Sequence, residues 1–125
     1  MGRILVVVVA VVYIALGAWA VADVRGVASL LGITPAGPGS ELELRAMYGG
    51  LEIGLGVFLL WCASNKTTLR TGLLCVAATV GGLGLTRLTG IVMDPSQPSL
   101  QLLLATAELA TTGLVVIEIV RKRGT

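Results

Sequence analysis

Four apolar stretches, each close to 20 residues long and separated by short polar segments, limit how this chain can fold more than any other feature. A helix needs about 20 mainly apolar residues to cross the hydrocarbon core of a bilayer. The mean hydropathy of +0.94 and the charged fraction of 13% exclude an ordinary water-soluble domain, in which about a quarter of the residues are charged. The sequence therefore predicts one all-α domain over residues 1–125, an integral membrane four-helix bundle with helices at about 4–22, 41–63, 70–93 and 99–120.

The first apolar stretch has two interpretations. It opens after Arg3 and contains Ala18-Trp19-Ala20, which is typical of a signal-peptidase site, so a cleaved export signal is the alternative to a membrane helix. We expect the stretch to be retained as a helix.

The connections carry signals for where helices begin and end. Residues 24–31 form a short amphipathic stretch that ends at Gly32, and a segment rich in Pro and Gly follows it. Ser40 and Glu43 have the spacing of a capping box, in which each side chain accepts a hydrogen bond from the other residue's amide, so we expect the second helix to begin here. Residues 64–69 predict a tight polar turn before the third helix.

The basic residues predict the orientation in the membrane. Six of the nine Lys and Arg residues would lie on the side that holds both termini, and outside the helices the opposite side would hold only Arg25. The positive-inside rule then places both termini of this multi-pass protein in the cytoplasm. The basic residues are not interleaved with aromatic residues along one face, so we expect no nucleic-acid partner.

The residues that usually hold metals are scarce. The chain has no histidine, and Cys62 and Cys75 do not form a CxxC pair, so metal and haem sites lack their usual ligands. We predict no metal and no cofactor. Both cysteines would lie near the reducing side of the membrane, which also argues against a disulfide.

Four ionisable residues fall inside the predicted helices, where a charge at the bilayer centre costs at least about 2.5–3.5 kcal/mol. Arg45 and Glu52 lie on the second helix, and the other two are Arg87 on the third and Glu108 on the fourth. At 1.5 Å per residue they would lie about 6 to 16 Å below the outer helix ends, a difference that an arginine side chain covers. We predict ion pairs between Glu52 or Glu108 and Arg87, with Arg45 nearer the mouth of a cavity.

Helical spacing gives these residues polar neighbours. Gln101, Glu108 and Thr112 share a stripe of the fourth helix, and steps of four, three and four residues place a second group on one stripe of the second helix. The members of this second stripe are Glu41, Arg45, Tyr48 and Glu52. Turned inward, the two stripes would make one polar cavity. Tyr13, in the middle of the first helix, could face this cavity or only a neighbouring helix.

The run from Glu43 to Glu52, which reads Glu-Leu-Arg-Ala-Met-Tyr-Gly-Gly-Leu-Glu, has Arg87 and Glu108 downstream of it. In these features the chain resembles a family of small bacterial four-helix membrane proteins catalogued as Domain of Unknown Function 4345. The likeness covers nearly the whole chain, and its most specific part runs from Arg45 to Glu52. The resemblance implies the membrane topology, in a bacterial inner (plasma) membrane, and no activity.

The first function that the residues suggest is a membrane enzyme acting on a lipophilic small molecule. One of Glu52 and Glu108 would be the acid and the other the base, because carboxylates in different environments can divide these roles. Epoxide opening, isomerisation or cyclisation would suit such a site, whose residue types are similar to those of the soluble, differently folded limonene-epoxide hydrolases. The catalytic candidates are Glu52, Glu108, Arg87 and Tyr48, and the substrate-binding candidates are Arg45, Gln101 and Tyr13.

Two other classes of function stay open. A proton-coupled binder or transporter subunit for a small molecule or lipid would use the arginines to hold a polar head group, and it would need a homo-oligomer because four helices are few for alternating access. A structural accessory protein would pack its glycine-rich helices against a partner, with the ion pairs fixing only the helix register. We rank the enzyme first and the scaffold last, because scaffolding gives no reason for paired charges at this depth.

Overall fold

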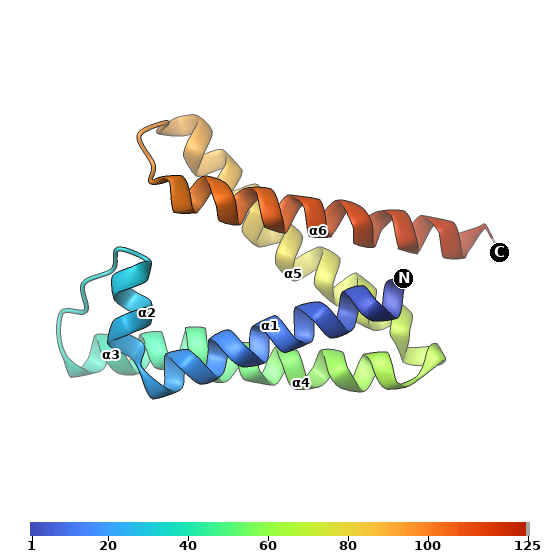
Figure 1. Cartoon of the computed structure of the whole chain (residues 1–125), viewed down its shortest axis with the longest axis horizontal. Coiled ribbons are helices and arrows are strands. Elements are labelled where there is room, and N and C mark those ends of the chain that lie inside the picture. The colour runs from blue at the N-terminus through green and yellow to red at the C-terminus, as the bar shows by residue number, and fades with distance from the viewer. Residues whose placement is uncertain (125) are drawn as a thin grey trace. The chain divides into compact units, whose positions relative to one another are not determined.

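The computed structural model describes residues 1–124, which form helices joined by short loops (Figure 1). Four helical segments are long and apolar enough to cross a membrane, namely Gly2–Ala22, Pro38–Ser64, Lys66–Met93 and Ser99–Arg123. They confirm the predicted all-α class of a multi-pass membrane protein. The elements are α1 (Gly2–Ala22), α2 (Val24–Leu30), α3 (Pro38–Arg45), the π-helix η1 (Ala46–Gly50), α4 (Leu51–Ser64), α5 (Lys66–Met93) and α6 (Ser99–Arg123).

The structure consists of two compact units. One contains residues 1–6 together with the chain from residue 62 onward, and so includes α5 and α6. The other contains residues 7–61, with most of α1 and α4 and all of α2, α3 and η1.

Close contact between α5 and α6 depends on two glycines. A Cβ atom on Gly84 would lie 3.1 Å from Leu109 Cδ2 and 3.2 Å from Glu108 Cβ, and one on Gly81 would lie 3.1 Å from Thr112 Cγ2. Small residues allow helices to approach closely in a membrane, where apolar side chains gain little by leaving lipid. The two glycines therefore set the spacing at which side chains of α5 and α6 meet.

The connection between α4 and α5 is a single residue, Asn65, so the predicted turn over residues 64–69 is wrong. The Thr68 hydroxyl donates to the carbonyl oxygens of Cys62 at 2.9 Å and of Asn65 at 3.3 Å. The last carbonyl groups of a helix have no partner within it, and Thr68 supplies one for Cys62. The polar residues therefore form the first turn of α5, which begins at Lys66 rather than near residue 70.

The short helix α2 has capping interactions at both ends and corresponds to the predicted amphipathic stretch. The Asp23 carboxylate accepts from the Gly26 amide at 3.0 Å at its start. At its end Gly32 has a φ of +71°, and the Ile33 amide donates to the Ala28 carbonyl at 2.8 Å. This six-to-one bond is the Schellman arrangement that glycine favours.

The predicted capping box at Ser40 and Glu43 is wrong, because the helix begins earlier, at Pro38. Proline suits the first turn of a helix, where no amide hydrogen is needed. Ser40 lies at the third helical position and bonds back to Gly37, accepting from its amide at 3.0 Å and donating to its carbonyl at 2.8 Å. Gly37 has a φ of +156°, a conformation that residues with a Cβ rarely adopt.

A π-helix, η1, interrupts the second membrane-spanning segment. The Leu51 amide donates to the carbonyl of Ala46, five residues earlier, where an α-helix would use a carbonyl four residues earlier. The insertion includes Gly49 and Gly50, which have low α-helix propensity. A π-turn holds about one extra residue, so the residues after it are turned by up to about 100° from their α-helical positions. The predicted stripe therefore does not continue unchanged from Arg45 to Glu52.

Glycines also bring α1 against the η1–α4 segment. A Cβ atom on Gly17 would lie 2.8 Å from the carbonyl oxygen of Gly49. One on Gly56 would lie 2.8 Å from the Ala10 carbonyl oxygen and 2.5 Å from Ile14 Cγ1. The later residue of α1 meets the earlier residue of the η1–α4 segment, and the earlier meets the later. The two helices therefore run antiparallel, with their backbones in contact.

Near the end of α6 lies a buried acidic residue, Glu118, which is 6% exposed. Its Oε1 accepts from Arg121 Nη1 at 2.9 Å. Glu118 thus pairs with a basic residue three positions later on the same helix, a spacing that puts the two side chains on one face.

The loop between α5 and α6 is organised by Asp94. Its carboxylate accepts from the Ser96 hydroxyl at 2.5 Å, from the Ser96 amide at 3.1 Å and from Gln97 Nε2 at 3.3 Å. The hydrogen bonds from Ser96, led by its hydroxyl, hold the pKa of Asp94 below its ordinary value of 3.8.

We expect this loop to loosen in acid. Because the pKa of Asp94 is lower in the folded chain than in the unfolded chain, the carboxylate stabilises the loop above its ordinary pKa and loses that effect as pH falls through the lowered pKa. The Asp94 carboxyl carbon and the Ser96 amide should show one shared NMR titration below pH 3.8. Ser96→Ala should move the midpoint upward, and an unchanged midpoint would show that Ser96 is not the cause.

Candidate functional site

Arg87 of α5 and Glu108 of α6 form an ion pair, and Glu108 is one of the two partners predicted for Arg87 from the sequence. Arg87 Nε lies 3.1 and 3.0 Å from the two carboxylate oxygens of Glu108. Arg87 Nη1 also donates to Gln101 Oε1 at 2.6 Å. The side chains of Arg87 and Glu108 are 23% and 15% exposed. One guanidinium thus bonds to two side chains that lie two turns apart on α6.

Local packing explains why the Arg87 and Glu108 side chains lie within hydrogen-bonding distance. Gly84 lies one turn before Arg87 and brings the α5 backbone against the Cβ atom of Glu108. The Thr112 hydroxyl donates to the Glu108 carbonyl at 2.8 Å, so its hydrogen bond is made within α6 and not to Arg87. Two residues of the predicted α6 stripe, Gln101 and Glu108, therefore both bond to Arg87, and Thr112 does not.

A second group of polar side chains lies in the other unit, on the continuous α3–η1–α4 segment. Arg45 ends α3, Tyr48 lies within η1, and Glu52 is in the first turn of α4. All three are half-buried. Over residues 1–124 the structure gives none of the three side chains a hydrogen bond or an ion pair, and Arg45 Nε is the only buried side-chain nitrogen or oxygen there without a partner. This group differs from the α5–α6 pair in having unused hydrogen-bonding capacity.

Glu52 and Tyr13 lie at the same level of the α1–α4 pair. Glu52 falls between the two glycines through which η1 and α4 meet α1. Tyr13, which is 9% exposed, falls in the same way between Ala10 and Gly17 of α1. Since residues three and four apart share a helix face, both side chains belong to the faces on which these two helices meet.

Each unit thus holds part of the predicted site. That the two parts line one cavity stays a prediction. Within the described residues 1–124, no three Cys, Asp or Glu side chains are grouped as a metal site requires. The α5–α6 unit holds Arg87, Gln101 and Glu108, and the other unit holds Tyr13, Arg45, Tyr48 and Glu52.

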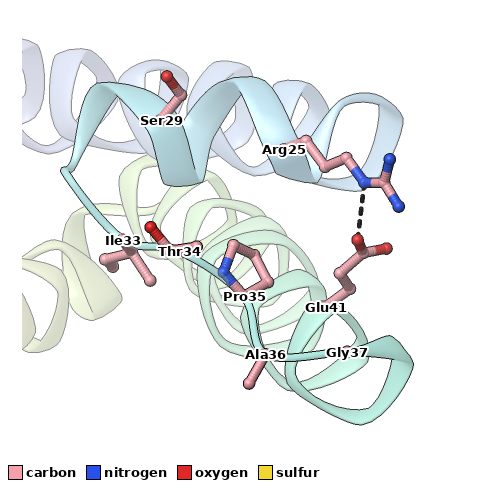
Figure 2. A pocket seen from close by; sticks show the side chains of 8 residues that line it. All are labelled: Arg25, Ser29, Ile33, Thr34, Pro35, Ala36, Gly37 and Glu41. Atoms are coloured by element: carbon pink, nitrogen blue, oxygen red, sulfur yellow. Dashed lines mark hydrogen bonds and ion pairs between the residues drawn. The ribbon is translucent and has the colours of Figure 1, made fainter.

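Sequence reasoning missed an ion pair between α2 and α3. Arg25 Nε donates to Glu41 Oε1 at 2.7 Å (Figure 2), so Glu41 pairs with α2 rather than with the predicted polar stripe. The two residues are 16 positions apart with a loop between them, and no helical spacing connects them. They line an open pocket of about 470 Å³ with Ser29, Ile33, Thr34, Pro35, Ala36 and Gly37.

The fold and the site define a class, a multi-pass all-α membrane protein with an arginine–carboxylate pair between its last two helices. In its second membrane-spanning segment the chain also carries an arginine, a tyrosine and a glutamate whose side chains have no hydrogen bond or ion pair within residues 1–124. The model of the family described as Domain of unknown function (DUF4345) matches residues 1–118. The chain belongs to this family, as the run from Glu43 to Glu52 indicates. Comparison with curated proteins and with solved structures found no match.

Proposed function

We propose that this protein binds a lipophilic small molecule within the membrane and transforms it by acid/base chemistry, with Glu52 as the residue that transfers the proton. The observation that carries the proposal is the difference between the two carboxylates. Both oxygens of Glu108 accept from Arg87, whereas Glu52 has no hydrogen bond or ion pair within residues 1–124. Carboxylates in such different environments can take different roles in acid/base catalysis.

The cost of an intramembrane charge supports a chemical role for Glu52. A carboxylate that served only to hold helices together would be expected to have a cationic partner, as Glu108 does, because an unpaired charge is expensive in the bilayer. A carboxyl group that is not committed to an arginine can give a proton to a bound molecule or take one from it. Epoxide opening, isomerisation and cyclisation each need such a transfer on a largely apolar molecule.

The remaining residues have supporting roles in this proposal. Tyr48 lies one turn before Glu52 and would orient an oxygen of the substrate through its hydroxyl. Glu108 and Gln101 hold Arg87 in a fixed position rather than moving protons, since Glu108 bonds through both oxygens. The proposed setting is the bacterial inner membrane with both termini in the cytoplasm, supported by the distribution of basic residues.

Glu52→Gln should lower the turnover of a lipophilic substrate by at least about 100-fold, the usual scale for losing a general acid or base. The assay incubates purified protein in lipid nanodiscs with a panel of lipophilic epoxides and polyenes and measures products by mass spectrometry. Glu43→Gln is the matched control, because Glu43 is exposed on α3 outside the site and its loss should leave turnover unchanged. Failure of the wild type to convert any of the compounds, or equal turnover by wild type and Glu52→Gln, would refute the proposal.

A transport function is the second candidate, because an unpaired carboxyl on a membrane-spanning segment can also carry a coupled proton. It would give uptake of an unchanged molecule into proteoliposomes, and this uptake would collapse with the pH gradient. It would also require a homo-oligomer, which cross-linking in the native membrane would detect.

A further inference from the structure

We propose that the molecule bound beside Arg45 carries an anionic oxygen head group, such as a carboxylate, which accepts hydrogen bonds from the Arg45 guanidinium. This inference rests on the proposed function for the lipophilic character of the ligand. It goes further by assigning the ligand a charged end and by giving Arg45 the role of holding it.

The first observation is the lone buried donor. Arg45 Nε has no hydrogen-bond partner, and it is the only such buried side-chain atom within residues 1–124. Leaving a buried donor unsatisfied is unfavourable, and more so when the group is charged. An oxygen from outside the chain would remove this cost.

The second observation is that, in the described part of the chain, three of the six other arginines have a carboxylate partner, and the remaining three, Arg3, Arg70 and Arg123, are exposed. Arg25, Arg87 and Arg121 each bond to a carboxylate, at 2.7, 3.0 and 2.9 Å. Guanidinium groups form their strongest hydrogen bonds with carboxylate and phosphate oxygens, often two at a time. Arg45 is buried more than Arg25 or Arg121 and yet lacks the acidic partner that both of them have.

The nearest acidic residue further along the same segment does not fill this gap. Glu52 lies seven residues after Arg45, which is about 10 Å along a helix, and η1 turns the two residues toward different directions. Arg45 is also nearer the end of the membrane-spanning segment than Glu52 is. A head group at Arg45 would therefore leave the apolar part of the ligand to extend deeper, toward the level of Glu52.

The test compares an acid with a neutral molecule of the same length. Full-length protein in phosphatidylcholine nanodiscs is incubated with dodecanoate or with dodecanol, and bound ligand is measured by native mass spectrometry. We expect dodecanoate to bind at least about tenfold more tightly, which is about 1.4 kcal/mol. Arg45→Met should abolish this preference, and Arg45→Lys should keep part of it because the charge stays while the fork of donors is lost. Arg70→Met, which removes an exposed arginine of α5, is the matched control and should bind as the wild type does.

A second arm identifies the source of the head group. If phosphatidylglycerol in the nanodisc displaces dodecanoate from the wild type and not from Arg45→Met, the ligand is a membrane phospholipid; if it displaces none, the ligand is a free amphiphile. Both results support an anionic head group. Equal binding of acid and alcohol by the wild type, or an unchanged preference in folded Arg45→Met and Arg45→Lys, would overturn the inference.

The two proposals fail in different ways. Glu52→Gln should still bind dodecanoate, so preserved Arg45-dependent binding without any turnover would support the inference and remove the proposed chemistry. Turnover of neutral lipophiles that depends on Glu52 and is indifferent to Arg45 would do the reverse.

Discussion

Arg87→Met and Glu108→Met should each destabilise the protein by about 3 kcal/mol, whereas the double substitution should cost much less than either. Each single change leaves one charge of a largely buried pair without its partner, and such changes cost about 3–5 kcal/mol in protein interiors. Removing both charges together replaces the pair with apolar side chains, which is often neutral or stabilising. The lower end of the range applies because the side chains of Arg87 and Glu108 are still 23% and 15% exposed.

A double-mutant cycle measures this coupling directly, with free energies of unfolding taken from steric trapping in bicelles. The Arg25–Glu41 pair is the matched control, because the Arg25 side chain is 80% exposed and exposed pairs contribute about 0.2–1 kcal/mol. Coupling at Arg87–Glu108 no larger than in this control would mean that the pair contributes little to the fold.

Gly56→Ala should destabilise the protein by about 1–3 kcal/mol, the range for forcing an extra methyl group into a packed interface. The new Cβ atom would lie 2.8 Å from the Ala10 carbonyl oxygen and 2.5 Å from Ile14 Cγ1. The Ile14 side chain can rotate, but the Ala10 carbonyl belongs to the α1 backbone and moves only with the helix. The contact between α1 and α4 would therefore have to open.

Gly54→Ala is the matched control for this prediction. The two glycines lie on the same helix, and a Cβ atom on Gly54 would meet nothing within 4 Å. Both substitutions raise helix propensity by up to about 1 kcal/mol, so Gly54→Ala should be neutral or stabilising. Similar effects of Gly54→Ala and Gly56→Ala on the free energy of unfolding would contradict a packing role for Gly56.

The membrane-spanning segments and one ion pair could be predicted because the bilayer imposes simple requirements. A spanning helix needs a minimum apolar length, and this length is visible in the hydropathy of the chain. The cost of charge in lipid favours pairing an intramembrane arginine with an acid, and Glu108 is one of the two partners predicted for Arg87. The helix ends were less accurate, because they depend on particular hydrogen bonds, such as those of Ser40 to Gly37 and of Thr68 to Cys62.

The features that sequence reasoning missed depend on tertiary contacts. The Arg25–Glu41 pair needs the path of the loop after α2, and no periodic pattern encodes that path. The π-helix contains Gly49, which Gly17 of α1 approaches closely. These two residues are more than 30 positions apart in the sequence. The adjacent pair Gly49-Gly50 was the one local signal, and it is not specific, because Gly81-Gly82 lies within the regular α-helix α5.

Because η1 holds an extra residue, the side chains of α3 and α4 face directions other than those that a continuous α-helix would give them. Removing one residue from Ala46–Gly50 would convert η1 into α-helix and leave Arg45 and Glu52 in nearly the same relative direction, because the π-turn already absorbs that residue. The apolar length would hardly change, so the segment would still fit the bilayer. A single deletion at this point would therefore be absorbed locally, and both the arginine and the glutamate would keep their directions and their positions in the membrane.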